Sequence, residues 1–286
     1  MKNAIVAAFL FLGSCKSTDS INRFAGSAGS GVIELGRSSF GFGQFCKLYS
    51  PGELGLMTDT SLYARFPRPK VSCAAYKTSD SLVLIINRAL ADYFSLLQSG
   101  SDKKLLSYNA RPLVSSLADL QPRVLPDLSF SEEKITAVKG LLNTLLNEPL
   151  KYYRAQKLRK IMQENDSALS RVIGAYVFIL DSALDGEIDQ ALENYKSFVY
   201  APLYGKSAGS VEKAFVNNRY KEFLNEMEEE RLKIHKSVRV LQTIGKDHHL
   251  LASAAHKAGF TEAESEIALD VILINNLIGE IIRLTR

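Results

Sequence analysis

The chain has 286 residues, with 35 lysine and arginine residues against 31 aspartate and glutamate residues. The resulting formal net charge of +4 is too small and too dispersed to indicate nucleic-acid binding. Hydrophobic residues make up 46% of the sequence, which is typical of a folded globular protein of one or two domains. The four histidines leave little material for a histidine-rich metal site.

The amino terminus carries a short apolar segment behind one positive charge. Lys2 precedes the apolar run from Ala4 to Leu12. A run of about nine residues is too short to cross a bilayer as a helix, which needs roughly 20. The pattern therefore predicts a signal peptide over residues 1–14.

The tetrapeptide Leu12-Gly13-Ser14-Cys15 follows directly. It resembles the lipobox of bacterial lipoproteins, in which a large aliphatic residue and two small residues precede an acylated cysteine. The resemblance covers residues 1–15 only. It implies cleavage before Cys15, a membrane anchor of acyl chains such as palmitate on that residue, and residence on the inner membrane, the outer membrane or the surface of a bacterial cell. The alternatives are an ordinary signal peptide that contains a cysteine, and a cytosolic protein with an apolar first helix.

The other two cysteines, Cys46 and Cys73, would remain as a pair in an oxidising compartment. We expect a disulfide between them, which would close a loop of about 27 residues and stabilise the fold by about 3 kcal/mol. The alternative is two buried thiols.

Composition divides the chain into four segments. Residues 1–14 are the predicted signal peptide, and residues 15–39, rich in Ser, Gly and Ala, are predicted to be a lipidated flexible tether. Residues 40–77 carry prolines and glycines and are expected to be irregular. Residues 78–286 show helical spacing of apolar residues and are predicted to form a helical bundle.

Within the bundle, breaks between helices are expected at Asn165–Ser167 and at Asp185-Gly186, and Gly245 is expected to end or bend a helix. The last helix, residues 262–284, is apolar around most of its circumference and is expected to be surrounded by other helices of the chain or by a partner protein. The fold class is therefore all-α, an irregular multi-helix bundle behind a coil-rich segment.

Two groups of side chains are candidate sites. His248, His249 and His256 lie close together in sequence, but the H-E-x-x-H spacing of a zinc helix is absent, so metal binding is a weak alternative to partly buried histidines. A basic stripe, with spacing of three residues, could contact an anionic partner or lipid headgroups, although a solvated surface explains it as well. The stripe consists of Lys151, Arg154, Lys157 and Lys160.

No catalytic motif stands out. Gly205-Lys206-Ser207-Ala208-Gly209 matches the letters of G-x-S-x-G, but no strand is predicted before it, as that motif requires, and Tyr200 stands where a phosphate loop ending in Gly205-Lys206-Ser207 would need a glycine. We therefore expect a lipoprotein without a cofactor and favour one without enzymatic activity over an envelope hydrolase. Its helical domain would bind or hold in place another component of the cell envelope. The alternative is a helical lipoprotein that binds a ligand or metal.

Overall fold

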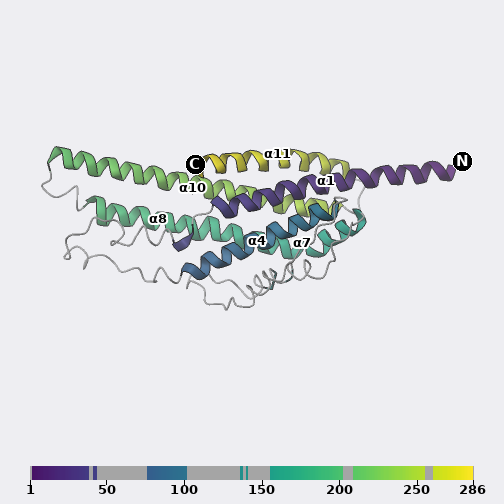
Figure 1. Ribbon diagram of the computed structural model, residues 1–286, viewed down its shortest axis with the longest axis horizontal. Helices are drawn as coiled ribbons and strands as arrows, with labels where there is room; N and C mark the ends of the chain where they lie inside the picture. Colours follow the sequence, from purple (N-terminus) through teal and green to yellow (C-terminus); the bar gives the residue numbers. More distant parts are fainter. Residues whose placement is uncertain are drawn as a thin grey trace.

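The computed structural model describes residues 2–38, 41–43, 76–101, 136–137, 140, 155–201, 209–254 and 260–285, with side chains from residue 19 onward apart from a few. Every regular element in these ranges is a helix, which confirms the predicted all-α fold. Figure 1 shows an elongated bundle. Its long helices are α1 (Lys2–Ser38), α4 (Tyr76–Ser101), α7 (Ala155–Phe178), α10 (Ser210–Ala254) and α11 (Phe260–Thr285).

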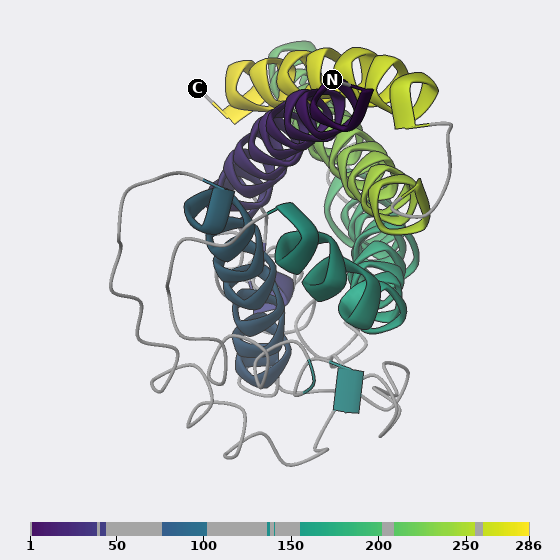
Figure 2. The same cartoon turned by 90° about the vertical axis from the view of Figure 1, so that its right-hand side faces the viewer.

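Consecutive long helices run in opposite directions (Figures 1 and 2). Helices α10 and α11 illustrate this, because Lys236 pairs with Glu280 while Lys246, farther along α10, pairs with the earlier residue Asp270. The enclosed side chains form one hydrophobic core to which all five long helices contribute. Its largest fully buried members include Phe24, Tyr93, Phe94, Tyr176 and Ile86.

The predicted flexible tether, residues 15–39, falls on the second half of α1. From residue 19 to residue 38 this segment is helical, and one of its faces is fully buried against the bundle. The tether prediction is therefore wrong for these residues. The buried face consists of Ile21, Phe24, Ala25, Ala28, Val32 and Leu35.

Small residues explain why this segment is packed. Glycines let two helix backbones approach closely because they have no Cβ. A Cβ on Gly36 would lie 2.5 Å from Asn87 Oδ1 of α4, and one on Gly26 would lie 2.9 Å from Gln98 Nε2. The few large side chains recur at helical spacing on the buried face, so the Ser/Gly/Ala composition serves close packing here.

The predicted breaks in the second half of the chain are also wrong. Residues 155–201 are helical without interruption, as α7, the π-helical turn η1 (Ile179–Leu184), α8 (Asp185–Asn194) and a second π-helical turn, η2 (Tyr195–Tyr200). The Asn165 amide donates to the Ile161 carbonyl at 2.8 Å within the helix. Likewise α10 continues past Gly245 to Ala254. Burial of the apolar face outweighs local breaking signals of about 1 kcal/mol each.

One helical stretch in the described part of the chain, Lys157–Ser197, is long and apolar enough to cross a membrane by length and composition alone. In that window 44% of the residues are buried inside the bundle, and a core helix of a soluble protein passes the same test. The stretch is therefore weak evidence for a membrane span.

Candidate functional site

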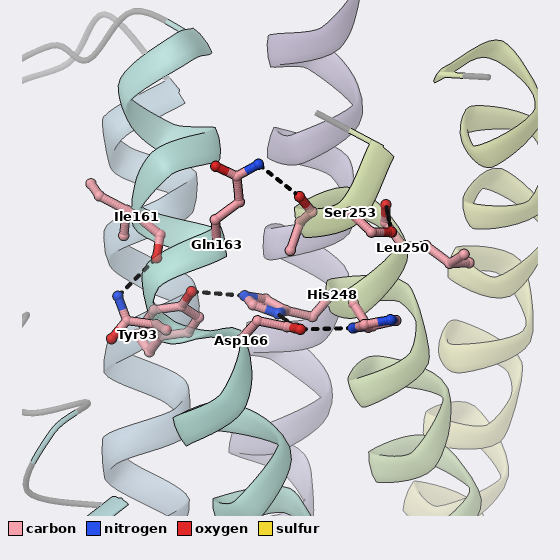
Figure 3. Close-up of polar contacts among 10 residues, drawn as sticks. Tyr93, Ile161, Gln163, Asp166, His248, Leu250 and Ser253 are labelled. Carbon is pink, nitrogen blue, oxygen red and sulfur yellow. Dashed lines mark hydrogen bonds and ion pairs between the residues drawn. The ribbon is translucent and has the colours of Figure 1, made fainter. Parts of the chain in front are cut away.

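A chain of hydrogen bonds crosses the bundle from α4 through α10 to α7 (Figure 3). Tyr93 Oη lies 2.8 Å from His248 Nε2, and His248 Nδ1 lies 2.9 Å from Asp166 Oδ1. The second oxygen of Asp166 lies 2.7 Å from His249 Nδ1. An ionised carboxylate only accepts, so both histidines donate from Nδ1, and His248 Nε2 accepts the hydroxyl hydrogen of Tyr93.

Burial determines the charge state of this network. Tyr93 and His248 are fully buried, whereas His249 is exposed. Burial lowers the pKa of His248 and raises the pKa of Tyr93. The hydrogen bond from His248 is the largest of the effects that lower the pKa of Asp166. At neutral pH the network therefore holds a neutral tyrosine, a neutral His248 and an ionised Asp166. Its hydrogen bonds join three helices: α4, α10 and α7.

The geometry gives the metal alternative no support in the described residues. Both ring nitrogens of His248 are engaged, by Tyr93 and by Asp166. In the part of the chain that the structure describes, no three histidine, cysteine or acidic side chains are placed to hold a metal ion. His256 lies outside the described residues. The sequence pattern indicated His248 and His249 as candidate site residues, but it did not indicate that Tyr93 and Asp166 are their partners.

Asp247, next to His248, has a different environment. It is fully buried, and within the described residues neither carboxylate oxygen meets a hydrogen-bond donor. Burial is the first cause of a raised pKa of Asp247, at about 8, and the neighbouring Asp270 of α11 is the second. Asp247 is therefore mostly a neutral carboxylic acid at neutral pH. Lys246 forms ion pairs beside it, with Nζ 2.6 Å from Asp270 and 2.8 Å from Glu266.

Half of the predicted basic stripe can be placed. Lys157 and Lys160 are exposed near the start of α7, and Lys160 Nζ lies 3.7 Å from Glu164. Lys151 and Arg154 lie outside the described residues, as do Cys46 and Cys73 of the expected disulfide. The disulfide and the full basic stripe therefore remain predictions.

A cavity lies between α1, α7 with η1, and the middle of α10. Its volume of about 10 Å³ suits roughly one water molecule and excludes an organic ligand. Glu230 and Lys233 form a buried ion pair at its wall. The other lining residues are Leu35, Ser38, Tyr176, Leu180, Leu184, Ile234 and Ser237.

The start of α10 carries two large apolar side chains that are open to solvent. Val211 is 80% exposed and Phe215 is 64% exposed, one helical turn apart. We call this pair the α10 tip. Behind it, α10 is held to η2 by stacked rings: Tyr220 lies 4.3 Å from Tyr200, and Phe223 lies 4.2 Å from Tyr195 between ring centroids. The aromatic stack fixes the helix while the α10 tip stays exposed.

Helix α11 has two unlike faces. Its inner face is buried against α1 and α10, through Ile267, Ile274, Leu277, Ile278 and Ile281. On its outer face Leu269 is 69% exposed and Ile272 is 57% exposed. Helix α11 lies at the edge of the bundle (Figure 2), so the expectation that other helices of the chain surround it is wrong, whereas cover by a partner protein stays a prediction.

Comparison with known proteins gives no relative for this chain: no family model, no curated protein and no solved structure matches it significantly. The arrangement of its own residues is therefore the basis for a functional proposal.

Proposed function

We propose that this protein is a lipoprotein of the bacterial cell envelope, anchored through Cys15, whose helical bundle binds another envelope protein through the α10 tip. The observation that carries the proposal is the exposure of Val211 and Phe215 on a helix end that is braced by stacked aromatic rings. Exposed apolar groups on a rigid support are typical of protein-binding surfaces.

The position of Cys15 supports the anchoring part. The described core residues of α1 begin at Ile21, so cleavage before Cys15 would leave all of them in the mature protein. Because residues 19–38 are packed, the bundle would follow closely behind the lipid. Ser20 Oγ donates to Glu264 at 2.9 Å, which places this part of α1 beside the start of α11.

The α10 tip lies at the opposite end of the elongated bundle from the amino terminus (Figure 1). The 45 residues of α10 correspond to a helix about 68 Å long. An anchor at one end and an apolar docking pair at the other would present the binding surface away from the membrane. The exposed Lys157 and Lys160 lie near the anchored end, where they could meet anionic lipid headgroups.

The docking part is tested by site-specific photo-crosslinking of the full chain in native membranes. A photoreactive residue at Phe215 should give a discrete adduct with another envelope protein. The same residue at Glu229, which is exposed on the same helix, is the matched control and should give none. Equal labelling at both positions, or no adduct at Phe215, would contradict the proposed docking surface.

The anchoring part is tested separately by intact-mass analysis of membrane-extracted protein. We expect a chain that begins at Cys15 and carries added acyl mass, and we expect Cys15→Ala to release the protein from the membrane. A chain that retains Met1 would overturn the anchor and leave the docking result unaffected.

A further inference from the structure

The outer face of α11 carries a regular stripe of side chains. Its members follow one another at intervals of four and three residues in alternation, the spacing that keeps one side of a helix against a second helix. All are exposed except Gly279, which is half-buried. We call this set the outer stripe; it consists of Ser265, Leu269, Ile272, Asn276, Gly279 and Arg283.

The outer stripe is complementary to itself when reversed. If a second α11 runs antiparallel across it, Leu269 faces Gly279 of the other copy, and Ile272 faces Asn276. Leu269 is a large exposed side chain, whereas a Cβ added to Gly279 would meet no atom within 4 Å, so the two shapes fit. A polar residue such as Asn276 within an apolar seam favours one register over others.

The charges beside the stripe are also complementary in this orientation. Near the start of α11, two carboxylates, Glu266 and Asp270, surround the single ammonium of Lys246. Near its end, the cations Lys236, Arg239 and Arg283 surround the single carboxylate of Glu280, whose pKa they lower. An antiparallel second copy brings the acidic end of each helix towards the basic end of the other, whereas a parallel copy would set like charges together.

We propose that the outer stripe is a self-association surface, through which two copies of this chain pair by antiparallel contact of their α11 helices. Two-fold pairing of one patch with itself is the commonest symmetry of soluble oligomers. The observations behind the proposal are separate from those behind the lipid anchor and the α10 tip. Because α1 runs parallel to α11, the antiparallel pair sets the two amino termini at opposite ends, so two anchored copies would pair with their long axes along the membrane, and this pairing excludes the upright arrangement described above.

Disulfide trapping between two differently tagged full-length chains in native membranes tests both the pairing and its direction. One chain carries Leu269→Cys and the other carries Gly279→Cys, and oxidation should link the two tags. Two chains that both carry Leu269→Cys should link poorly, because ten helical residues separate the positions by about 15 Å in the antiparallel register. Chains without an added cysteine control for linkage through Cys15, Cys46 or Cys73.

A second measurement uses the full chain in detergent, with its mass followed by sedimentation against protein concentration. Ile272→Asp should weaken dimer formation at least about tenfold, because it places two carboxylates in the seam. The matched control Leu84→Asp puts the same charge on another exposed apolar position, on α4, and should leave the dimer unchanged. A wild-type chain that sediments as a monomer throughout, or preferential linkage of Leu269→Cys to itself, would overturn the proposal.

Discussion

Helices α1 and α11 lie side by side and run in the same direction, with Ser27 donating to Asn275 between them at 3.0 Å. They bury their residues in different ways. Helix α1 contains many small residues, yet Phe24 and Ile21 are fully enclosed; α11 is rich in large aliphatic residues, yet Leu269 and Ile272 face solvent. Burial in this bundle follows from where a large side chain stands on its helix and from how closely the neighbouring backbone approaches.

The largest expected effect comes from the buried face of α1. Phe24 packs edge-on against Phe94 of α4, with ring centroids 5.7 Å apart. Phe24→Ala should lower the free energy of unfolding by about 3–5 kcal/mol, because it removes a large core side chain. Urea unfolding of the full chain in detergent measures this. Ile33→Ala, on the exposed face of the same helix, is the control and should change stability by less than about 0.5 kcal/mol.

A matched pair of substitutions tests the two faces of α11. Ile274 is fully buried, so Ile274→Ala should cost about 2–5 kcal/mol in the same unfolding experiment. Ile272→Ala, two residues away on the exposed face, should cost less than about 0.5 kcal/mol at a concentration where the chain is monomeric. Similar losses at both positions would mean that the outer face is covered within the chain.

The difference between α1 and α11 also shows what sequence could predict. The all-α class followed from helical spacing, as in the run from Leu82 to Leu97 of α4, which the structure buries along one face. The packing of residues 19–38 was missed because the value of a glycine depends on a partner helix, here on Asn87, that lies far away in sequence. Amino-acid composition shows which residue types a segment contains, but it does not show which distant residues will pack against them.

The polar contacts illustrate the same limit. His248 was noticed for its neighbours in sequence, whereas its actual partners, Tyr93 and Asp166, are 155 and 82 residues away. In the sequence, Asp166 belongs to Asn165–Ser167, a pattern that predicts a break between helices. The continuous helix that carries it is stabilised by tertiary burial, which a local pattern does not report.

Close approach of α1 to α4 is tested by adding one methyl group. Gly36→Ala would place its Cβ against Asn87, whose amide donates to the Val32 carbonyl at 2.6 Å and to Tyr176 Oη at 3.3 Å. Displacing this buried amide should cost about 1–3 kcal/mol. Gly174→Ala provides the control, because no atom lies near its Cβ position and alanine favours a helix by up to about 1 kcal/mol. A stabilising Gly36→Ala would refute the close contact.

The smallest expected effect is a pH dependence of the folding stability that comes from one buried carboxyl group on α10. The pKa of Asp247, beneath α11, is raised to about 8, with burial as the first cause and Asp270 as the second. The folded chain therefore binds this proton more tightly than the unfolded chain does. The contribution of Asp247 to stability is fully present near its ordinary pKa of about 4 and is lost as the pH rises through about 8.

Asp247→Asn removes that ionisation while keeping a similar shape. The stability of the variant relative to the wild type should therefore increase from about pH 5 to about pH 9, by on the order of 1 kcal/mol. The lowered pKa of His248 acts in the opposite sense, with stability lost as the pH falls below about 6.5, but both proteins share it and it cancels in the difference. Urea unfolding across this pH range measures the gap, and two parallel curves would show that Asp247 does not titrate with the fold.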